Sequence, residues 1–225
     1  MTNEKKFIIG PEGQLEAELT LPTQESKIAA LLCHPHPLYG GSMGDGVLQT
    51  AGDACLTQNI ATLKFNFRGV GVSQGISGRG DFIPTISNGV KLSPEVGDVI
   101  AAYEWLTQSQ KFNQILIIGY SFGANMLWQA LPELAQRSAE QNTIPNTILI
   151  APPNTAMAFI KQEGLVGKRI SIIAGATDDY VDITALNGHC ALKSFIISGA
   201  DHFFSGQHQA LGAAVTAALK EQLSY

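Results

Sequence analysis

Six short apolar runs recur along the chain, and each is continuous rather than alternating between apolar and polar residues. They occupy residues 28–33, 61–67, 115–118, 147–150, 170–174 and 194–197. Runs of this kind are typical of parallel strands that are buried on both faces of a sheet. Segments with helical spacing separate several of them, at residues 47–55, 96–106, 126–134 and 211–223. This alternation predicts a doubly wound, mostly parallel α/β sheet of about eight strands.

The first part of the chain predicts an antiparallel hairpin with two exposed strands. Residues 7–9 and 15–21 are strand-like and flank the turn-forming tetrapeptide Gly10-Pro11-Glu12-Gly13. The whole chain has 225 residues, of which 45% are hydrophobic and 15% charged, and this composition excludes a disordered chain. We expect one α/β domain over residues 1–225.

Charge and cysteine content narrow the possible partners and compartment. The net charge is −5 and no basic cluster is present, which argues against nucleic acid or an anionic membrane as a partner. No stretch is apolar over enough residues for a signal peptide or a membrane span. Cys33, Cys55 and Cys190 are far apart and form no CxxC pair, so they predict buried, reduced thiols. We therefore expect a cytoplasmic protein.

Prolines mark the ends of two predicted helices. Ser93-Pro94 predicts an N-cap followed by a proline at the first helical position of the helix over residues 96–106. Pro132 predicts a kink or an end in the helix that starts near Ala124.

Two connecting segments determine whether the carboxyl edge of the predicted sheet is covered. Residues 75–93 are rich in glycine, have no clear period and predict a long loop at that edge. This loop either covers a ligand site or is a surface excursion. Residues 151–169 leave room for one short helix, which predicts a protein without a cap domain and with an open pocket.

The pattern G-x-S-x-G occurs at Gly119-Tyr120-Ser121-Phe122-Gly123, between a predicted strand and a predicted helix. A strand that turns into a helix over about one residue strains that residue and brings its neighbours two positions away close together, where glycines avoid a clash. The turn would present the Ser121 hydroxyl at the sheet edge, beside a helix N-terminus that favours negative charge. Ser121 is therefore the candidate nucleophile.

A serine hydroxyl needs a base, and the base needs an acid that holds its tautomer. The chain has five histidines. Among them, His202 follows the last predicted strand and should reach the same edge as Ser121, whereas His189 and His208 are interpreted as structural or surface residues. The acid is either Asp178 or Asp179, since both follow the preceding strand and the sequence does not determine the turn between them.

The chain resembles a small α/β-hydrolase without a cap, closest to the dienelactone-hydrolase-like group. The matching segments are residues 34–41, 65–75, 119–123, 175–181 and 199–204. The family places its acid three residues after a glycine, which corresponds to Asp178, and has the chain order serine, acid, histidine. The resemblance implies hydrolysis of a carboxylic ester or a related acyl bond, through a covalent acyl-serine.

Acyl transfer also needs N–H donors for the developing oxyanion. We expect one from the backbone of Phe122 and a second from the loop after residues 28–33. Pro35 and Pro37 have no N–H to donate, so we favour His36, with Leu38 next.

Arg68 and Asp98 are interpreted as structural, in a turn and in the first turn of a helix. Each of the four aromatic residues beside the proposed catalytic residues is interpreted as a core residue, with the alternative that one or two of them line an acyl pocket: Tyr120, Phe122, Phe203 and Phe204. Three alternatives remain. His34 and His36 could bind a metal together with Asp178 and His202. The glycines at 69, 71 and 75 loosely match a dinucleotide fingerprint. The scaffold could also be a non-catalytic binding protein.

The favoured prediction is a serine hydrolase in which Ser121, His202 and Asp178 act on a small-molecule acyl substrate, with no metal or organic cofactor.

Overall fold

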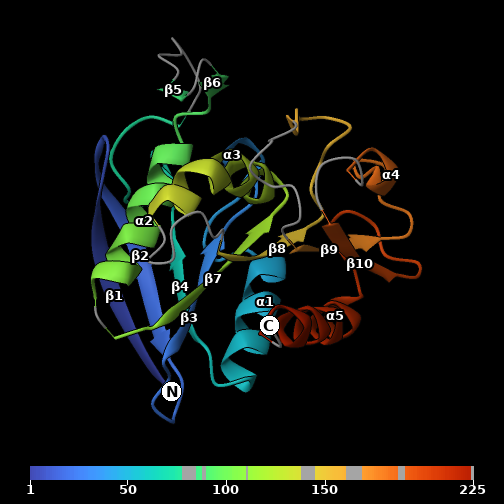
Figure 1. Cartoon of the computed structure of the whole chain (residues 1–225), viewed down its shortest axis with the longest axis horizontal. Helices are drawn as coiled ribbons and strands as arrows, with labels where there is room; N and C mark the ends of the chain where they lie inside the picture. The colour runs from blue at the N-terminus through green and yellow to red at the C-terminus, as the bar shows by residue number, and fades with distance from the viewer. Residues whose placement is uncertain are drawn as a thin grey trace.

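A computed structural model describes residues 1–77, 85–87, 90–109, 111–137, 145–160, 169–186 and 191–223. Its main sheet has eight strands in the order β1-β2-β4-β3-β7-β8-β9-β10 (Figure 1). Their bounds are β1 Thr2–Gly10, β2 Gly13–Leu21, β3 Ile28–Cys33, β4 Ala61–Phe65, β7 Gln114–Tyr120, β8 Asn146–Ile150, β9 Arg169–Gly175 and β10 Ala191–Ile197. Six strands of this sheet are parallel to one another: β4, β3, β7, β8, β9 and β10. At one edge, β2 pairs antiparallel with β4 and β1 pairs antiparallel with β2. The predicted doubly wound sheet of about eight strands is confirmed.

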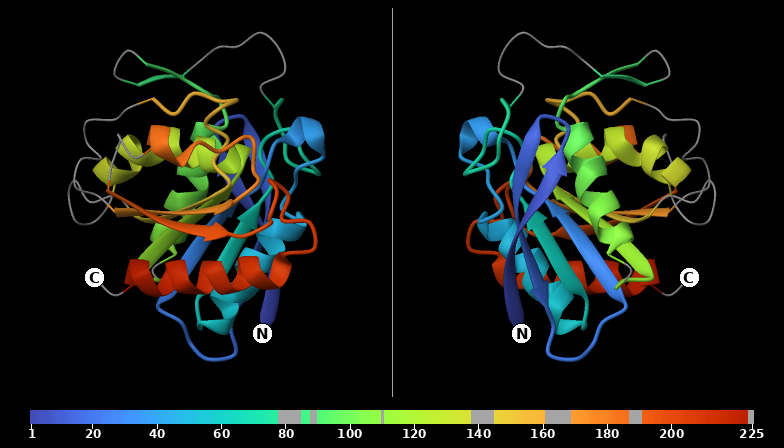
Figure 2. Two further views of the ribbon diagram at one scale, coloured as in Figure 1. Left: turned by 90° about the vertical axis from the view of Figure 1, so that its right-hand side faces the viewer. Right: turned by 90° about the vertical axis from the view of Figure 1, so that its left-hand side faces the viewer.

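Helices cover both faces of this sheet, as Figure 2 shows. Helices α2 (Val96–Gln108) and α3 (Phe122–Arg137) pack on one face, and α1 (Gly46–Thr57) and α5 (His208–Leu223) pack on the other. Short elements complete the chain: the 3₁₀ turn η1 (Pro37–Tyr39), the helix α4 (Ile183–Leu186), and the strands β5 (Thr85–Ser87) and β6 (Val90–Leu92).

Strand β3 shows why the apolar runs are continuous. Successive side chains of a strand point to opposite faces, and both faces of β3 are covered. Leu31 belongs to the core under α2 and α3, whereas Leu32 belongs to the core under α1 and α5, and both side chains are fully buried. Burial of each such side chain contributes about 1.5–3 kcal/mol. The sheet is therefore the middle layer of three and separates two cores.

The N-terminal hairpin is half-buried, contrary to the expectation of two exposed strands. Ile8, Leu15 and Leu19 are each 1% exposed and join the core, whereas Phe7 and Ile9 alternate with them and are exposed. The reason is that β2 pairs with β4, so one face of the hairpin continues the main sheet.

Ser93 is not the N-cap of α2, and Pro132 does not end α3; a kink at Pro132 stays a prediction. Helix α2 begins at Val96 with Glu95 at its N-cap position, and the Ser93 hydroxyl instead donates to the Glu95 carboxylate at 2.6 Å. Helix α3 continues through Pro132 to Arg137. An internal proline costs about 3 kcal/mol, and burial of most of α3 against the sheet and α2 outweighs that cost.

The predicted long loop over residues 75–93 contains secondary structure. Strands β5 and β6 pair as an antiparallel hairpin within it, which corrects the prediction of an irregular loop; residues 78–84, 88 and 89 lie outside the described part. The connection after β8 has no helix within residues 151–160, in agreement with the predicted absence of a cap.

The cysteines within the described segments are buried, as the sequence predicts. Cys33 and Cys55 are free, fully buried thiols, and burial raises the pKa of Cys55 to about 12. Cys190 and His189 lie outside the described residues. None of the helices in those segments has the length and apolar character needed to cross a membrane.

Candidate active site

Ser121 lies at the sharp turn between β7 and α3. Its backbone is left-handed, with φ of 53°, a strained conformation for a residue with a side chain. A Cβ on Gly119 would lie 2.6 Å from the carbonyl carbon of Gly123, and a Cβ on Gly123 would lie 2.6 Å from that of Cys33. Both positions therefore require glycine. The Ser121 N–H donates to Ile150 of β8 at 2.9 Å, which ties the turn to the neighbouring strand.

Three predicted residues meet above this turn. Ser121 Oγ is 2.9 Å from His202 Nε2, and His202 Nδ1 is 2.9 Å and 3.1 Å from the two carboxylate oxygens of Asp178. A neutral His202 that donates from Nδ1 to the carboxylate has its lone pair on Nε2, directed at the serine hydroxyl. The arrangement can therefore accept a proton from Ser121 and stabilise the resulting imidazolium.

The structure distinguishes Asp178 from Asp179. The Asp178 side chain is fully buried and also accepts the Tyr180 N–H at 2.9 Å, whereas Asp179 is exposed. Gly175 makes the approach possible, because a Cβ there would lie 2.6 Å from the carbonyl carbon of Ala200. The loops after β9 and β10 thus lie close enough for Asp178 to reach His202.

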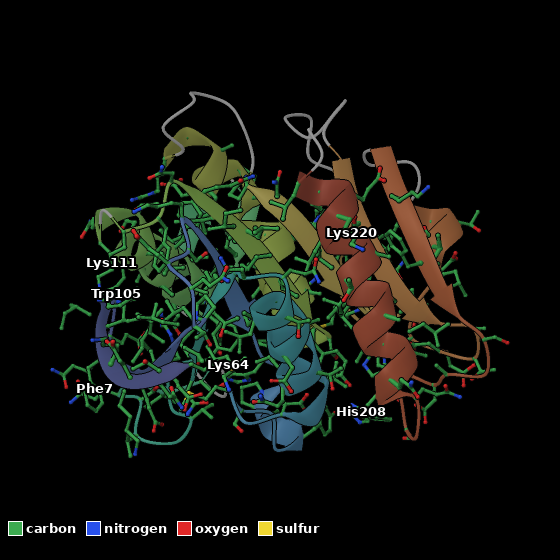
Figure 3. All side chains as sticks on the ribbon, turned by 90° about the horizontal axis from the view of Figure 1, so that it is seen from below. Phe7, Lys64, Trp105, Lys111, His208 and Lys220 are labelled. Carbon is green, nitrogen blue, oxygen red and sulfur yellow. The ribbon has the colours of Figure 1, made fainter. Side chains whose placement is uncertain are left out.

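Topology explains why residues distant in sequence converge. Ser121, Asp178 and His202 follow the carboxyl ends of β7, β9 and β10, which belong to one continuous parallel set. Carboxyl ends of parallel strands share one edge of the sheet. His208 is not part of this arrangement: it is the first residue of α5 (Figure 3), where it is exposed and its ring is 2.9 Å from the Thr50 hydroxyl of α1.

The expected oxyanion donors lie on two adjacent segments. Phe122 is the first residue of α3, and its ring packs on the His36 ring with centroids 4.7 Å apart. Within η1, the Leu38 N–H already donates to His36 Nδ1 at 3.1 Å. This bond favours His36 over Leu38 as the second donor. The oxyanion role itself remains a prediction for both Phe122 and His36.

His34 has a structural role. Its Nε2 accepts the Phe67 N–H at 3.0 Å, and its Nδ1 donates to the Pro35 carbonyl at 2.7 Å. Burial lowers its pKa to about 4, so the ring is neutral near pH 7. Both nitrogens are used by the backbone, which disfavours His34 as a metal ligand. In the described part of the chain, no group of three or more His, Cys, Asp or Glu is placed to hold a metal.

Arg68 and Asp98 form a buried ion pair. The guanidinium donates from Nε and Nη2 to Asp98, at distances down to 2.7 Å, and from Nη1 to Glu12 at 2.5 Å. Arg68 is 3% exposed and Asp98 is fully buried. The pair joins the turn after β4 to the first turn of α2, which agrees with the structural interpretation of both residues.

The glycines after β4 form turns rather than a phosphate cradle. Gly69, Gly71 and Gly75 all have positive φ, at 72°, 58° and 85°. Carboxylates hold this loop, since the Val72 N–H donates to Glu16 at 3.2 Å. A phosphate would be repelled there, and no helix begins at these glycines, so the dinucleotide alternative loses its support.

Three aromatic residues surround His202. The buried Tyr120 hydroxyl donates to the His202 carbonyl at 3.1 Å, and burial raises its pKa above the usual range. The Tyr180 and Phe203 rings contact the imidazole edge-on, at 4.9 Å and 5.4 Å. Phe203 is 62% exposed, so the expectation that it belongs to the core was wrong. The sequence signal for a place of Phe203 at the site was that it directly follows His202.

Comparisons with other proteins relate this chain to known sequences and structures. The chain is 35% identical over 213 residues to "Uncharacterized protein RP471" of Rickettsia prowazekii, covering 88% of this chain and 81% of that protein. An α/β serine hydrolase homologue from Coxiella burnetii is 30% identical, has a TM-score of 0.76, and matches over 97% of this chain and 98% of its own. Residues 85–181 match the family model described as "Protein of unknown function (DUF726)".

Two further solved structures extend the similarity. XC6422 from Xanthomonas campestris, described as an α/β serine hydrolase without lid, is 25% identical with a TM-score of 0.79 over 100% of this chain and 97% of its own. A dienelactone hydrolase from Anabaena variabilis, at 16% identity and a TM-score of 0.68 over 98% and 97% of the two chains, shares the fold. The chain therefore belongs to the α/β serine hydrolase superfamily, in the same family as the Rickettsia and Coxiella relatives.

Proposed function

We propose that this chain is a serine hydrolase that cleaves a carboxylic ester or a related acyl bond, such as a thioester or a lactone, in a small molecule. One observation carries the proposal: the continuous hydrogen-bonded line from Ser121 Oγ through His202 to the buried Asp178 carboxylate. Superfamily membership supports the reaction class, and the similarity to a dienelactone hydrolase supports an ester or lactone among its substrates.

The reaction begins with attack of Ser121 Oγ on the acyl carbon while its proton moves to His202 Nε2. Asp178 keeps the other proton on Nδ1 and stabilises the imidazolium. The Phe122 N–H, with His36 as the proposed second donor, holds the oxyanion, and each such donor lowers the barrier by about 2.7–4 kcal/mol. Collapse of the intermediate breaks the bond to the leaving group, which takes the proton from His202.

Water completes the cycle. It loses a proton to His202 Nε2 and attacks the acyl-serine carbon, and the acid leaves as the proton returns to Ser121. Every catalytic group in this scheme belongs to the protein chain, and the substrate and water supply the rest. We further propose a cytoplasmic location, since the two described cysteines are buried, reduced thiols.

The neighbouring aspartates provide a matched test. Asp178→Asn should lower kcat for p-nitrophenyl acetate by about ten-thousand-fold, because an amide at this position favours the wrong tautomer of His202. Asp179→Asn should leave kcat close to wild type, since that side chain is exposed to solvent. Equal activity of both variants would contradict the role of Asp178 as the acid of the triad, and absence of turnover in the wild type would favour a non-catalytic scaffold protein.

A further inference from the structure

Exposed apolar side chains gather where the strands end near Ser121. Leu38 and Tyr39 follow β3, Ile76 follows β4, and Tyr180 and Phe203 flank His202; each is at least 43% exposed. Exposed apolar side chains that cluster at one edge of a protein mark a binding surface more often than scattered ones do. The exposed apolar side chains at this edge therefore favour an apolar ligand.

A groove of about 480 Å³ lies within this surface, between the turn at residues 37–42 and the loop at residues 69–77. These segments lie side by side in Figure 2. The volume falls in the range of small-molecule sites. Its lining residues in the described segments are glycine, proline, serine and aliphatic residues, and none of them has an ionisable side chain.

The charged side chains that contact the loop at residues 69–77 disfavour an anionic ligand. Arg68 is already held by Asp98 and Glu12. The carboxylates of Glu12 and Glu16 accept N–H groups of the groove loop, from Ile76 at 3.5 Å and from Val72 at 3.2 Å. A carboxylate or phosphate on the ligand would meet like charge there, so a neutral group fits best.

Sheet order relates the groove to the chemistry. In the order β4-β3-β7-β8-β9-β10, Ser121 follows β7, the groove loops follow β3 and β4, and His202 follows β10 on the other side. The leaving group must lie next to His202, which gives it a proton. An acyl chain directed away from His202 points toward the side of β3 and β4, where the His36 ring packs on Phe122.

We infer that the groove between residues 37–42 and 69–77 binds the acyl chain of the substrate, and that the substrate is an ester of a neutral, apolar, medium-chain acid. The inference rests on the proposed function, and it assigns Leu38 and Ile76 as residues that determine acyl specificity. Both are exposed and line the groove.

Two exposed aliphatic residues of one loop give a matched test. Ile76 lines the groove and is 75% exposed, whereas Val72 is 63% exposed and does not line it. For the wild type, kcat/KM should be higher for p-nitrophenyl octanoate than for the acetate. Ile76→Asp should lower this octanoate-to-acetate ratio by on the order of tenfold, because the new carboxylate must be desolvated beside the chain. Val72→Asp should leave the ratio unchanged.

A substrate with a positive charge at the end of its acyl chain tests for a gain of activity in Ile76→Asp. The ω-aminooctanoate ester should be hydrolysed better by Ile76→Asp than by the wild type, because the ammonium can pair with the new carboxylate at the end of the groove. Val72→Asp should show no such gain.

The groove proposal and the proposed function fail in different ways. If a small fluorophosphonate labels Ser121 but Ile76→Asp and Val72→Asp give the same ratio as the wild type, the acyl site lies elsewhere and the hydrolase proposal stands. If the fluorophosphonate does not label Ser121 in the wild type, the hydrolase proposal fails, and the groove assignment fails with it.

Discussion

Buried His34 should make the stability of this protein fall steeply in mild acid. Its pKa is lowered from 6.5 to about 4, mainly by burial. Above pH 6.5 the ring is neutral in both the folded and the unfolded chain. As the pH falls from 6.5 toward about 4, the unfolded chain binds a proton that the folded chain does not, so the free energy of unfolding decreases. At about 1.4 kcal/mol for each pH unit, the loss amounts to about 3 kcal/mol.

Urea unfolding followed by the fluorescence of the buried Trp128 can measure this loss between about pH 7 and pH 4. His34→Gln retains groups that can hydrogen-bond to the backbone but cannot titrate in this range. The loss in the wild type should therefore exceed that in His34→Gln by about 3 kcal/mol. His208→Gln, a change at an exposed histidine, should keep the wild-type curve. Parallel curves for the wild type and His34→Gln would refute the reasoning.

Three further variants test close packing and the buried ion pair. Gly123→Ala should lower the free energy of unfolding by about 1–3 kcal/mol and reduce esterase activity, because its Cβ would lie 2.6 Å from the Cys33 carbonyl carbon. Gly212→Ala, whose Cβ would be 3.6 Å from its nearest neighbour, should instead be neutral or stabilising in thermal unfolding. Asp98→Asn should lower the free energy of unfolding, measured with urea, by about 3–5 kcal/mol, because it leaves the buried Arg68 charge without its main partner. A decrease below about 1 kcal/mol would show that the ion pair contributes little to stability.

Local sequence signals were sufficient where one interaction dominates. The continuous apolar runs predicted the parallel strands because both faces of the sheet are covered, as Leu31 and Leu32 show. Helix α3 does not end at Pro132, because the local cost of the proline is smaller than the gain from packing α3 against the sheet. Ser93 was misjudged because its hydroxyl binds Glu95 instead of an N–H of the helix.

The residues of the candidate site could likewise be predicted from the sequence only in part. Ser121 and His202 could be proposed from short patterns, since each follows a strand that ends at the common edge. The choice between Asp178 and Asp179 required the turn after β9, which buries one carboxylate and exposes the other. The partnership of Arg68 with Asp98 spans 30 residues of sequence, and no local pattern indicates it.

Labelling with a small fluorophosphonate, followed by peptide mass mapping, tests the central claim most directly. The label should be found on Ser121, be absent from Ser121→Ala, and form far more slowly in His202→Gln, which lacks the base that is 2.9 Å from the serine oxygen. A label on a different residue, or undiminished labelling of Ser121→Ala, would contradict the proposed role of Ser121.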